Sequence, residues 1–191
     1  NGAITASATD SIYLGSEADV RVASISTPAD VRLKTAGALR SAAGASQAAV
    51  QSRNVTLEAG SGDLGENALD MIVQVANNAA VTARAGGNLF LSSLVGDLRI
   101  EQIYSPGLAR IRSAGALVEV SPDLRRDIQA RYLQLFATTT IGSGGSELDR
   151  LDIATSLDGW AELEAAQGIY VLGLDDTLDV RSARSTSGDV A

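Results

Sequence analysis

The amino-acid sequence is similar to itself at an ungapped offset of 78 residues. When residues 18–59 are placed over residues 96–137, twelve of the 42 positions are identical, where chance would give only a few. The longest shared run, Ala-Gly-Ala-Leu at 36–39, returns unchanged at 114–117. A fixed period of this kind is typical of repeat architectures, in which each unit packs against its neighbours.

The match continues on both sides, with slips of one to four residues that loops of variable length would produce between fixed strands. An aliphatic–aromatic–aliphatic triplet at 12–14 returns at 89–91 and again at 169–171. We therefore predict a single β-solenoid segment of a longer chain over residues 1–191, with repeat one at 1–78, repeat two at 79–156 and a partial repeat three at 157–191.

Short alternations of apolar and polar residues fill each repeat. Residues 31–33 (Val-Arg-Leu) and 55–57 (Val-Thr-Leu) show the two-residue period of a strand with one buried face. Between such runs lie Gly, Asn, Asp, Ser and Pro, as in Ser-Gly-Asp at 61–63, which suit tight turns. The chain is therefore expected to be all-β, with strands of about three to five residues.

Strands at this spacing could build a sandwich or a solenoid, and the repeat favours the solenoid because stacked coils keep equivalent residues in equivalent surroundings. We predict a right-handed parallel β-helix with coils of about 19–20 residues, the handedness following the crossover rule. The super-repeat would then span about four coils and place Ile111 in the surroundings of Leu33. About ten coils at ~4.8 Å would form a rod of roughly 45–50 Å.

Two segments fit the coil pattern less well. Residues 41–53 are rich in Ala, and residues 121–135 resemble a capped amphipathic helix that follows Ser-Pro-Asp. A short helix or an irregular excursion from the coil is an alternative in both places, and the two segments are equivalent in the repeat.

The composition excludes several classes of chemistry. The chain contains no Cys and no His, so it lacks thiol nucleophiles, disulfides, Cys/His zinc sites and every triad with an imidazole base. Carboxylate chemistry or none remains, and we expect no enzyme activity, no cofactor and no metal ion. The net charge of −8 and the lack of basic runs with interleaved aromatics predict no nucleic-acid partner. No apolar run of eighteen residues occurs, so we expect no membrane insertion.

Three stretches carry a family resemblance: residues 54–65, 80–91 and 96–100, where aliphatic strands alternate with Gly-Ser-Gly-Asp, Gly-Gly-Asn and Gly-Asp turns. They resemble the degenerate repeats of filamentous-haemagglutinin-type adhesins, which are very large bacterial exoproteins. The resemblance implies a right-handed β-helical shaft that is secreted or held at the bacterial cell surface or in a biofilm matrix. It also implies that the shaft has no catalytic residues and that its partners are the neighbouring coils of the same longer chain.

A set of aromatic residues is the main candidate for surface contacts. Tyr13, Phe90 and Tyr170 each lie between two aliphatic residues that should point inward, so alternation sends the rings outward. On a four-coil repeat they would recur on one flank, roughly 19 Å apart. Two interpretations are open: a ladder that contacts a glycan or a laterally packed fibre, or rings that are each covered by a loop.

Carboxylates are the next candidates. Five of them lie at Gly-flanked turns and are expected to bind their own backbone, although a calcium ion is a further option there: Asp63, Asp97, Asp175, Asp176 and Asp189. Two acidic pairs, Glu162/Glu164 and Asp149/Asp152, could supply the carboxylates of a glycoside hydrolase, but nothing singles them out.

Other polar and aromatic residues have structural interpretations. Arg21, Arg32, Arg99 and Arg110 should face Asp or Glu of adjacent coils on a solvated surface, with about 0–1 kcal/mol for each pair. Trp160 is the only Trp, and we expect it to fill the core at an irregular junction.

The sequence therefore predicts a non-enzymatic shaft segment of an exported bacterial adhesin or surface fibre. The alternative is a polysaccharide-degrading or polysaccharide-binding β-helix. That alternative would need a groove lined by clustered acids and bases, at a place where the repeat breaks.

Overall fold

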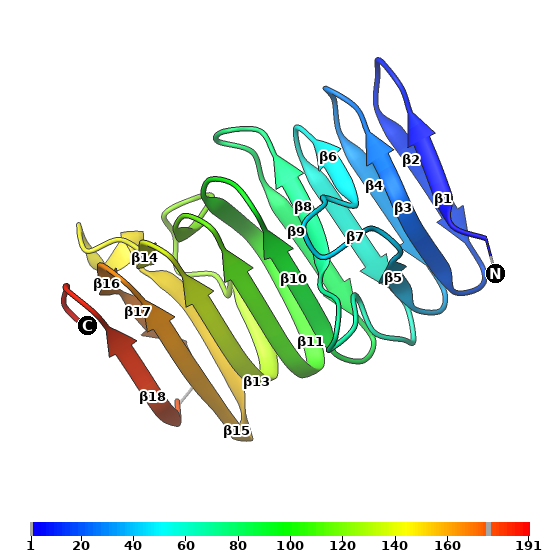
Figure 1. Cartoon of the computed structure of the whole chain (residues 1–191). Coiled ribbons are helices and arrows are strands. Elements are labelled where there is room, and N and C mark those ends of the chain that lie inside the picture. Colours follow the sequence, from blue (N-terminus) through cyan, green and yellow to red (C-terminus); the bar gives the residue numbers. More distant parts are fainter. Residues whose placement is uncertain (1, 175–176) are drawn as a thin grey trace.

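The computed structural model describes residues 2–174 and 177–191 and shows a parallel β-solenoid of about eight turns (Figure 1). The ladders between strands are parallel, and the two ends of the chain lie at opposite ends of the rod. Within the described ranges the one helical element is a single 3-10 turn, Glu147–Asp149. The all-β, parallel β-helical architecture predicted from the repeat is confirmed.

Each coil crosses two walls, which we call wall A and wall B. Wall A contains β2 (Ile12–Ser16), β4 (Val31–Thr35), β7 (Val55–Ala59), β9 (Val81–Ala85), β12 (Leu117–Glu119), β14 (Thr140–Ile141), β16 (Gly168–Ile169) and β17 (Val171–Gly173). Wall B contains β1 (Ile4–Ser7), β3 (Val20–Ser26), β5 (Leu39–Ser41), β6 (Val50–Ser52), β8 (Met71–Val75), β10 (Leu89–Ser93) and β18 (Val180–Ser185). Three long strands bend from wall A into wall B: β11 (Leu98–Ser113), β13 (Ile128–Ala137) and β15 (Leu151–Ala165).

The repeat contains an odd number of wall crossings. Seven crossings run from β3 to β10, and the next seven run from the start of β11 to β17. Leu33 therefore pairs with Leu57 on wall A, whereas Ile111 pairs with Leu135 on wall B, and both Leu33 and Ile111 are buried. The predicted equivalence of surroundings holds, but one repeat spans three and a half coils rather than about four, so successive repeats exchange walls.

The pairing details repeat as well. β1 pairs with β3 through a register shift directly after Ile4, and β9 pairs with β11 through the same shift directly after Ile100 and its partner Val81. A third copy of this shift follows Ala161, where β15 pairs with β18. Three equivalent irregularities at the same point of the repeat show that the repeat extends to the details of backbone hydrogen bonding.

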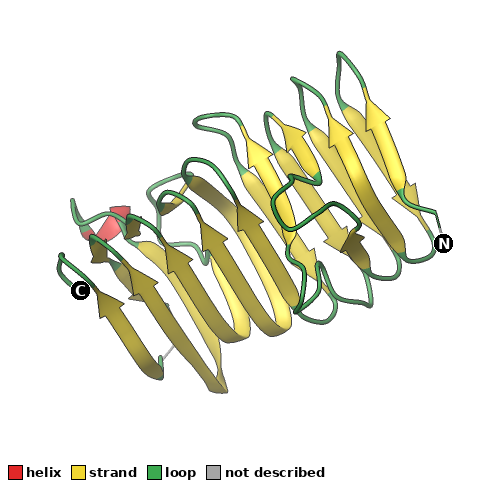
Figure 2. Ribbon diagram, in the orientation of Figure 1, coloured by secondary structure: helices red, strands yellow, loops and turns green. Residues whose placement is uncertain are grey.

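Some coils have the predicted length, since Ile12 pairs with Val31 and Leu98 with Leu117, 19 residues apart, but coils from which a loop leaves the wall are longer. Val31 pairs with Val55 and Val55 with Val81, which are steps of 24 and 26 residues. The extra residues lie in loops 42–49 and 65–70 on wall B and in their equivalents 120–127 and 142–150 on wall A. The loop between β5 and β6 stands out from the wall in view (Figure 2).

The two segments with possible helical character are irregular loops that lead into strands. Residues 42–49 precede β6, and the amphipathic pattern of 121–135 resolves into loop 120–127 followed by β13. β13 is a strand because Ile128 and Leu133 each pair with a buried aliphatic residue of the neighbouring coil. Wall pairing outweighs the local helical pattern there.

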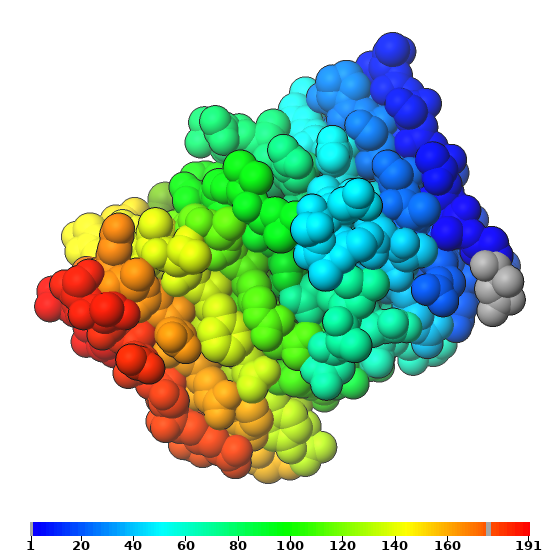
Figure 3. Space-filling model, viewed as in Figure 1, coloured from blue at the N-terminus to red at the C-terminus, as the bar shows by residue number. Residues whose placement is uncertain are grey.

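The core is a set of aliphatic columns. Val31, Val55 and Val81 stack on wall A, and Leu89, Ala109 and Leu133 stack on wall B. Branched aliphatic side chains repeat well at the inter-strand spacing of about 4.8 Å, and each buried Leu or Val contributes about 1.5–3 kcal/mol. The space-filling view shows the sequence colours succeeding one another along the rod, so neighbouring coils make the contacts (Figure 3).

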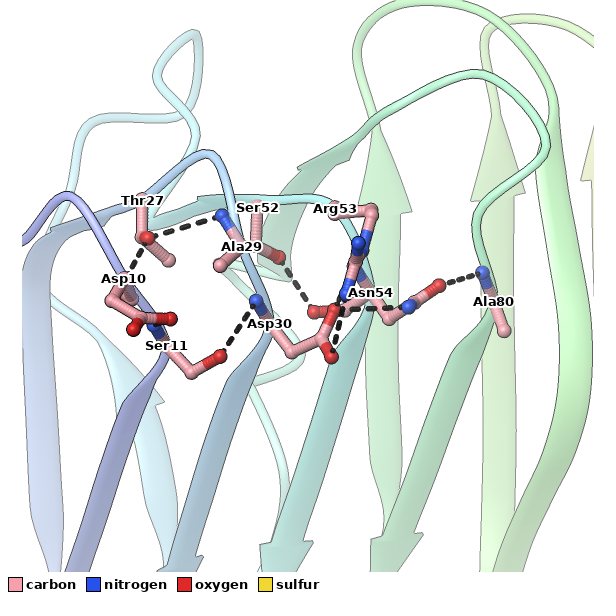
Figure 4. A network of polar contacts seen from close by, with 9 residues as sticks. All are labelled: Asp10, Ser11, Thr27, Ala29, Asp30, Ser52, Arg53, Asn54 and Ala80. Carbon is pink, nitrogen blue, oxygen red and sulfur yellow. Dashed lines mark hydrogen bonds and ion pairs between the residues drawn. The ribbon is translucent and has the colours of Figure 1, made fainter.

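A polar ladder connects successive coils at one corner (Figure 4). The Thr27 hydroxyl donates to the Asp10 carbonyl at 2.6 Å, and the Asn54 side-chain amide donates to Asp30 at 2.9 Å. The Asn54 side-chain oxygen in turn accepts the amide of Ala80 at 2.9 Å. These bonds satisfy corner groups that the sheet ladders leave unpaired, and they hold four coils in register.

No helix in the described part of the chain is long and apolar enough to cross a membrane.

Candidate functional site

The three aromatic residues singled out in the sequence do not form one row. Tyr13 and Tyr170 belong to wall A, and Phe90 belongs to wall B, because an odd number of crossings separates successive copies. Tyr13 is 68% exposed, whereas Phe90 is 5% exposed beneath the guanidinium of Arg110, 4.6 Å from the ring centre. The expected ladder on a single flank is therefore absent.

The turn carboxylates bind the backbone of the next coil rather than their own. Asp63 accepts the amide of Asn88 at 2.6 Å, and Asp97 accepts the amide of Ala116 at 2.8 Å. Asp189 is exposed near the last described strand. Asp63 and Asp97 therefore act as inter-coil caps. The remaining two predicted turn acids, Asp175 and Asp176, lie outside the described residues.

In each acidic pair considered for glycoside cleavage, the two carboxyl groups have different environments. Glu162 accepts the side-chain amide of Gln134 at 2.9 Å, and Glu164 is exposed on the same strand. Asp149 accepts the Ser146 hydroxyl at 2.8 Å, whereas Asp152 is fully buried. The members of each pair therefore differ in burial and in partners.

The outward arginines have different environments. Arg32 forms the expected exposed pair with Glu58 of the next coil, with 2.8 Å between nitrogen and oxygen. Arg99 donates to the Val120 carbonyl at 2.9 Å instead of to an acid, and Arg21 is exposed. The expectation of a solvated ion pair is wrong for Arg110, because that side chain is buried.

Trp160 is not a core residue. It lies half-buried on β15 and stacks on Tyr132 of the neighbouring coil, with 5.2 Å between ring centres. The guanidinium of Arg181 covers it at 4.7 Å. The residues that fill the core next to it are Gly159 and Ala161, because alternation along the strand turns the indole outward.

A groove of about 520 Å³ lies on wall B beside loop 65–70. Asp70 and Arg110 form its polar floor, and Ile72 and Leu94 contribute apolar surface. Its depth comes from loops 42–49 and 65–70, which rise from the wall on one side. The groove therefore combines a buried ion pair with an apolar rim on wall B.

An ion-pair network crosses the floor of this groove. Asp70 binds Arg110 at 2.7 Å and Arg112 at 2.9 Å, and it accepts the hydroxyl of Ser92. Burial alone would raise the pKa of Asp70, but the hydrogen bonds from Arg110 and Ser92 outweigh it and hold that pKa below its usual value. Asp70 is therefore an ionised carboxylate at neutral pH.

The chemistry of the groove suits a polar ligand. Two guanidinium groups and one carboxylate leave a net positive charge, and the side chain of Arg112 is 44% exposed. Arg112 is also held over Phe136, 5.2 Å from the ring centre, which restricts its orientation. A few fixed polar groups beside apolar surface are common features of small-molecule binding sites. Sequence reasoning missed this site because Asp70 and Arg110 are 40 residues apart, a spacing unrelated to the repeat.

A second cluster lies on wall A in repeat two. Glu119 ends β12, Asp127 directly precedes β13, and Asp152 is the second residue of β15. They are 7%, 5% and 0% exposed, respectively. Neither side-chain oxygen of Asp152 has a hydrogen-bond partner, and Asp127 accepts the amide of Asp152 at 2.9 Å. The backbone amide of Asp123 acts on Glu119 and lowers its pKa, but burial outweighs it. We call Glu119, Asp127 and Asp152 the acid cluster.

Burial and mutual repulsion perturb the acid cluster strongly. Burial raises the pKa of Glu119 to about 7, and the nearby Asp152 carboxylate adds to this effect. Burial likewise raises the pKa of Asp127 to about 7 and that of Asp152 to about 6. The carboxyl groups are therefore largely protonated in weakly acidic solution. Among the residues described, no three acidic side chains are arranged so that they could hold a metal ion.

Comparisons with protein-family models, with curated proteins and with solved structures gave no match.

Proposed function

We propose that this chain is a shaft segment of an exported bacterial adhesin or surface fibre. The observation that carries the proposal is the repeated geometry: equivalent strands, register shifts and aliphatic columns recur from one repeat to the next along one axis. A body built in this way gains length by adding repeats, because each coil contacts its neighbours. The resemblance to filamentous-haemagglutinin-type repeats supports the exported setting.

The mechanism is mechanical. Hydrogen bonds of the parallel ladders run along the rod, and the aliphatic columns exclude water from its axis. Exposed ion pairs such as Arg32–Glu58 add little stability. At about 4.8 Å per coil, one repeat of three and a half coils moves a distal group outward by about 17 Å.

The repeat makes a sharp test possible. Deletion of residues 20–97 removes one full period of 78 residues and joins Asp19 to Leu98. Asp19 is equivalent to Asp97, which precedes Leu98 in the natural chain, so the junction keeps the order of the repeat. β1 and β2 would then pair with β11 as β9 and β10 do, so the shortened chain should fold. Deletion of 28–97 is the control, because it joins non-equivalent positions and should give an insoluble or unfolded product.

The functional measurement uses the native bacterium. Antibody labelling and protease treatment of intact cells should detect the protein outside the cell. The in-register deletion should weaken attachment or biofilm formation while the shortened protein remains folded and exported. Retention of the protein in the cytosol would refute the proposal, and so would unchanged attachment by a strain that lacks the protein.

The groove on wall B favours a second candidate, a polysaccharide-binding or polysaccharide-degrading β-helix. Its polar floor of Asp70, Arg110 and Arg112 is the specific observation in support. Incubation with acidic and neutral polysaccharides tests both activities: affinity electrophoresis detects binding, and new reducing ends or unsaturated products reveal cleavage. Binding that is lost in Arg112→Ala but kept in Arg32→Ala would support this candidate, whereas equal loss in both variants would contradict it.

A further inference from the structure

The acid cluster has an uncharged counterpart elsewhere in the same molecule. In repeat two the Asp127 amide donates to the Asp152 carbonyl at 3.0 Å, and in repeat one the equivalent bond joins Ala49 to Ile72 at 2.8 Å. Glu119 pairs with Ile100 as Ser41 pairs with Val22. The backbone is thus the same in both places, and three buried side chains differ: Ser41, Ala49 and Ile72 in repeat one become Glu119, Asp127 and Asp152 in repeat two.

The two loops that cover the acid cluster add further negative charge. Asp123 of loop 120–127 acts on all three carboxyl groups, and Asp149 of loop 142–150 acts on Glu119. Their repeat-one equivalents are also uncharged, because Ala45 stands in the place of Asp123 and Leu69 in the place of Asp149. Five carboxyl groups therefore gather here, whereas the Asp70 carboxylate at the equivalent place in repeat one is neutralised by Arg110 and Arg112.

The basic side chains nearby do not neutralise the acid cluster. Arg99 of β11 donates to the Val120 carbonyl, and Arg125 approaches Asp123 at 3.9 Å on the exposed loop. Arg126 takes part in an interaction of its own, and Arg150 is half-buried at the end of loop 142–150. The charged groups that act most strongly on the three buried carboxyls are other carboxylates, with Asp123 acting on all of them. Buried carboxylates without a positive partner are costly, so the closed fold favours the protonated form.

We propose that the acid cluster is a pH-operated clasp: when protonated it keeps loops 120–127 and 142–150 closed on wall A, and when ionised it releases them. Opening of the loops lets water reach the charges at a smaller cost than unfolding of the rod. The proposal is independent of whether the rod is an adhesin.

The direction of the pH dependence follows from linkage. The pKa values of Glu119, Asp127 and Asp152 in the folded chain lie above their ordinary values of 4.5, 3.8 and 3.8. Between those values and about pH 7 the folded chain binds more protons than the unfolded one, so stability falls as pH rises through this window and is level above it. A single carboxyl with a pKa near 7 changes the opening equilibrium on the order of 100-fold between pH 5 and pH 8.

The test compares the natural chain with a variant that carries the repeat-one residues. The triple variant E119S/D127A/D152I installs side chains that the same backbone already accommodates in repeat one. Hydrogen exchange, corrected for intrinsic rates, is measured at pH 5 and pH 8 in the presence of a chelator. Loops 120–127 and 142–150 of the natural chain should lose protection on the order of 100-fold at pH 8, whereas loops 42–49 and 65–70 should not change.

The variants distinguish an ionisation effect from a packing effect. The triple variant should keep all four loops protected at both pH values. The isosteric change Glu119→Gln removes one ionisable group with little change of shape and should reduce the pH effect even if the triple variant does not fold. The proposal would be overturned if hydrogen exchange depended on pH equally in the natural chain and in Glu119→Gln. It would also be overturned if carbon-13 NMR gave pKa values below 5 for all three carboxyl groups.

Discussion

Gly142 offers a test of how closely adjacent coils approach. Its φ is +69°, a region that L side chains rarely adopt, and a Cβ atom there would lie 1.8 Å from the carbonyl oxygen of Tyr170 in the next coil. That oxygen accepts the amide of Leu151 at 3.1 Å, and the amide of Gly142 donates to Leu117 at 2.7 Å. Gly142→Ala therefore combines an unfavourable backbone conformation with a clash that separates two coils.

The expected magnitude comes from these two contributions. The left-handed conformation costs an Ala about 1–2 kcal/mol. Disruption of the bonds at Tyr170 and Leu117 adds about 1 kcal/mol for each net hydrogen bond. We expect Gly142→Ala to lower the free energy of unfolding by about 3 kcal/mol and the melting temperature by about 6–12 °C for a chain of this size.

Two other glycines separate the contributions. Gly96 has the same φ of +69° but open space around its Cβ position, so Gly96→Ala should cost about 1 kcal/mol. Gly15 lacks both features, and Gly15→Ala should change stability by less than about 0.5 kcal/mol. The assay is chemical and thermal denaturation of the three variants followed by circular dichroism. If Gly142→Ala were no less stable than Gly96→Ala, the argument from close coil approach would be refuted.

Further variants test the core and the groove. Leu135→Ala removes a fully buried side chain and should cost about 2–5 kcal/mol, whereas Leu94→Ala, at an exposed position, should cost less than about 0.5 kcal/mol in the same denaturation assay. Asp70→Asn leaves Arg110 buried without its ion pair and should cost about 3–5 kcal/mol, but Arg32→Ala should cost at most about 1 kcal/mol. Because the pKa of Asp70 is lowered, the contribution of this carboxylate is complete above its ordinary value of 3.8 and is lost as the pH falls through the folded value. Denaturation of the natural chain and Asp70→Asn at pH 2 and pH 6 measures this; a stability difference as large at pH 2 as at pH 6 would contradict it.

The repeat predicts the architecture well because residues with equivalent partners must keep equivalent polarity. The match of Leu33 to Ile111 correctly predicts that both are buried strand residues with aliphatic partners. It contains no information on how many coils separate them, since a two-walled rod offers the same surroundings on either wall. The predicted coil length holds for coils such as the one from Ile12 to Val31 but is too short where loops such as 42–49 leave the wall and contribute no alternation.

The candidate sites were harder to predict. The position of Phe90 on a strand correctly sends its ring away from the core, but the Arg110 side chain that covers it comes from the neighbouring coil. The groove depends on Asp70, which reaches Arg110 from a loop whose path the repeat does not specify. The acid cluster did leave a signal, because Asp127 and Asp152 face Ala49 and Ile72 when the two repeats are aligned. Differences between copies were thus more informative than their identities.

The odd number of wall crossings in each repeat has a consequence for any feature that is present in every copy. A side chain that is added at one position of every repeat would project from wall A in one repeat and from wall B in the next. A row confined to one flank would need a spacing of two periods, or the insertion of half a coil in each period. Lateral contacts that use every copy would therefore join a shaft to neighbours on both of its sides, which favours sheets of shafts over isolated pairs.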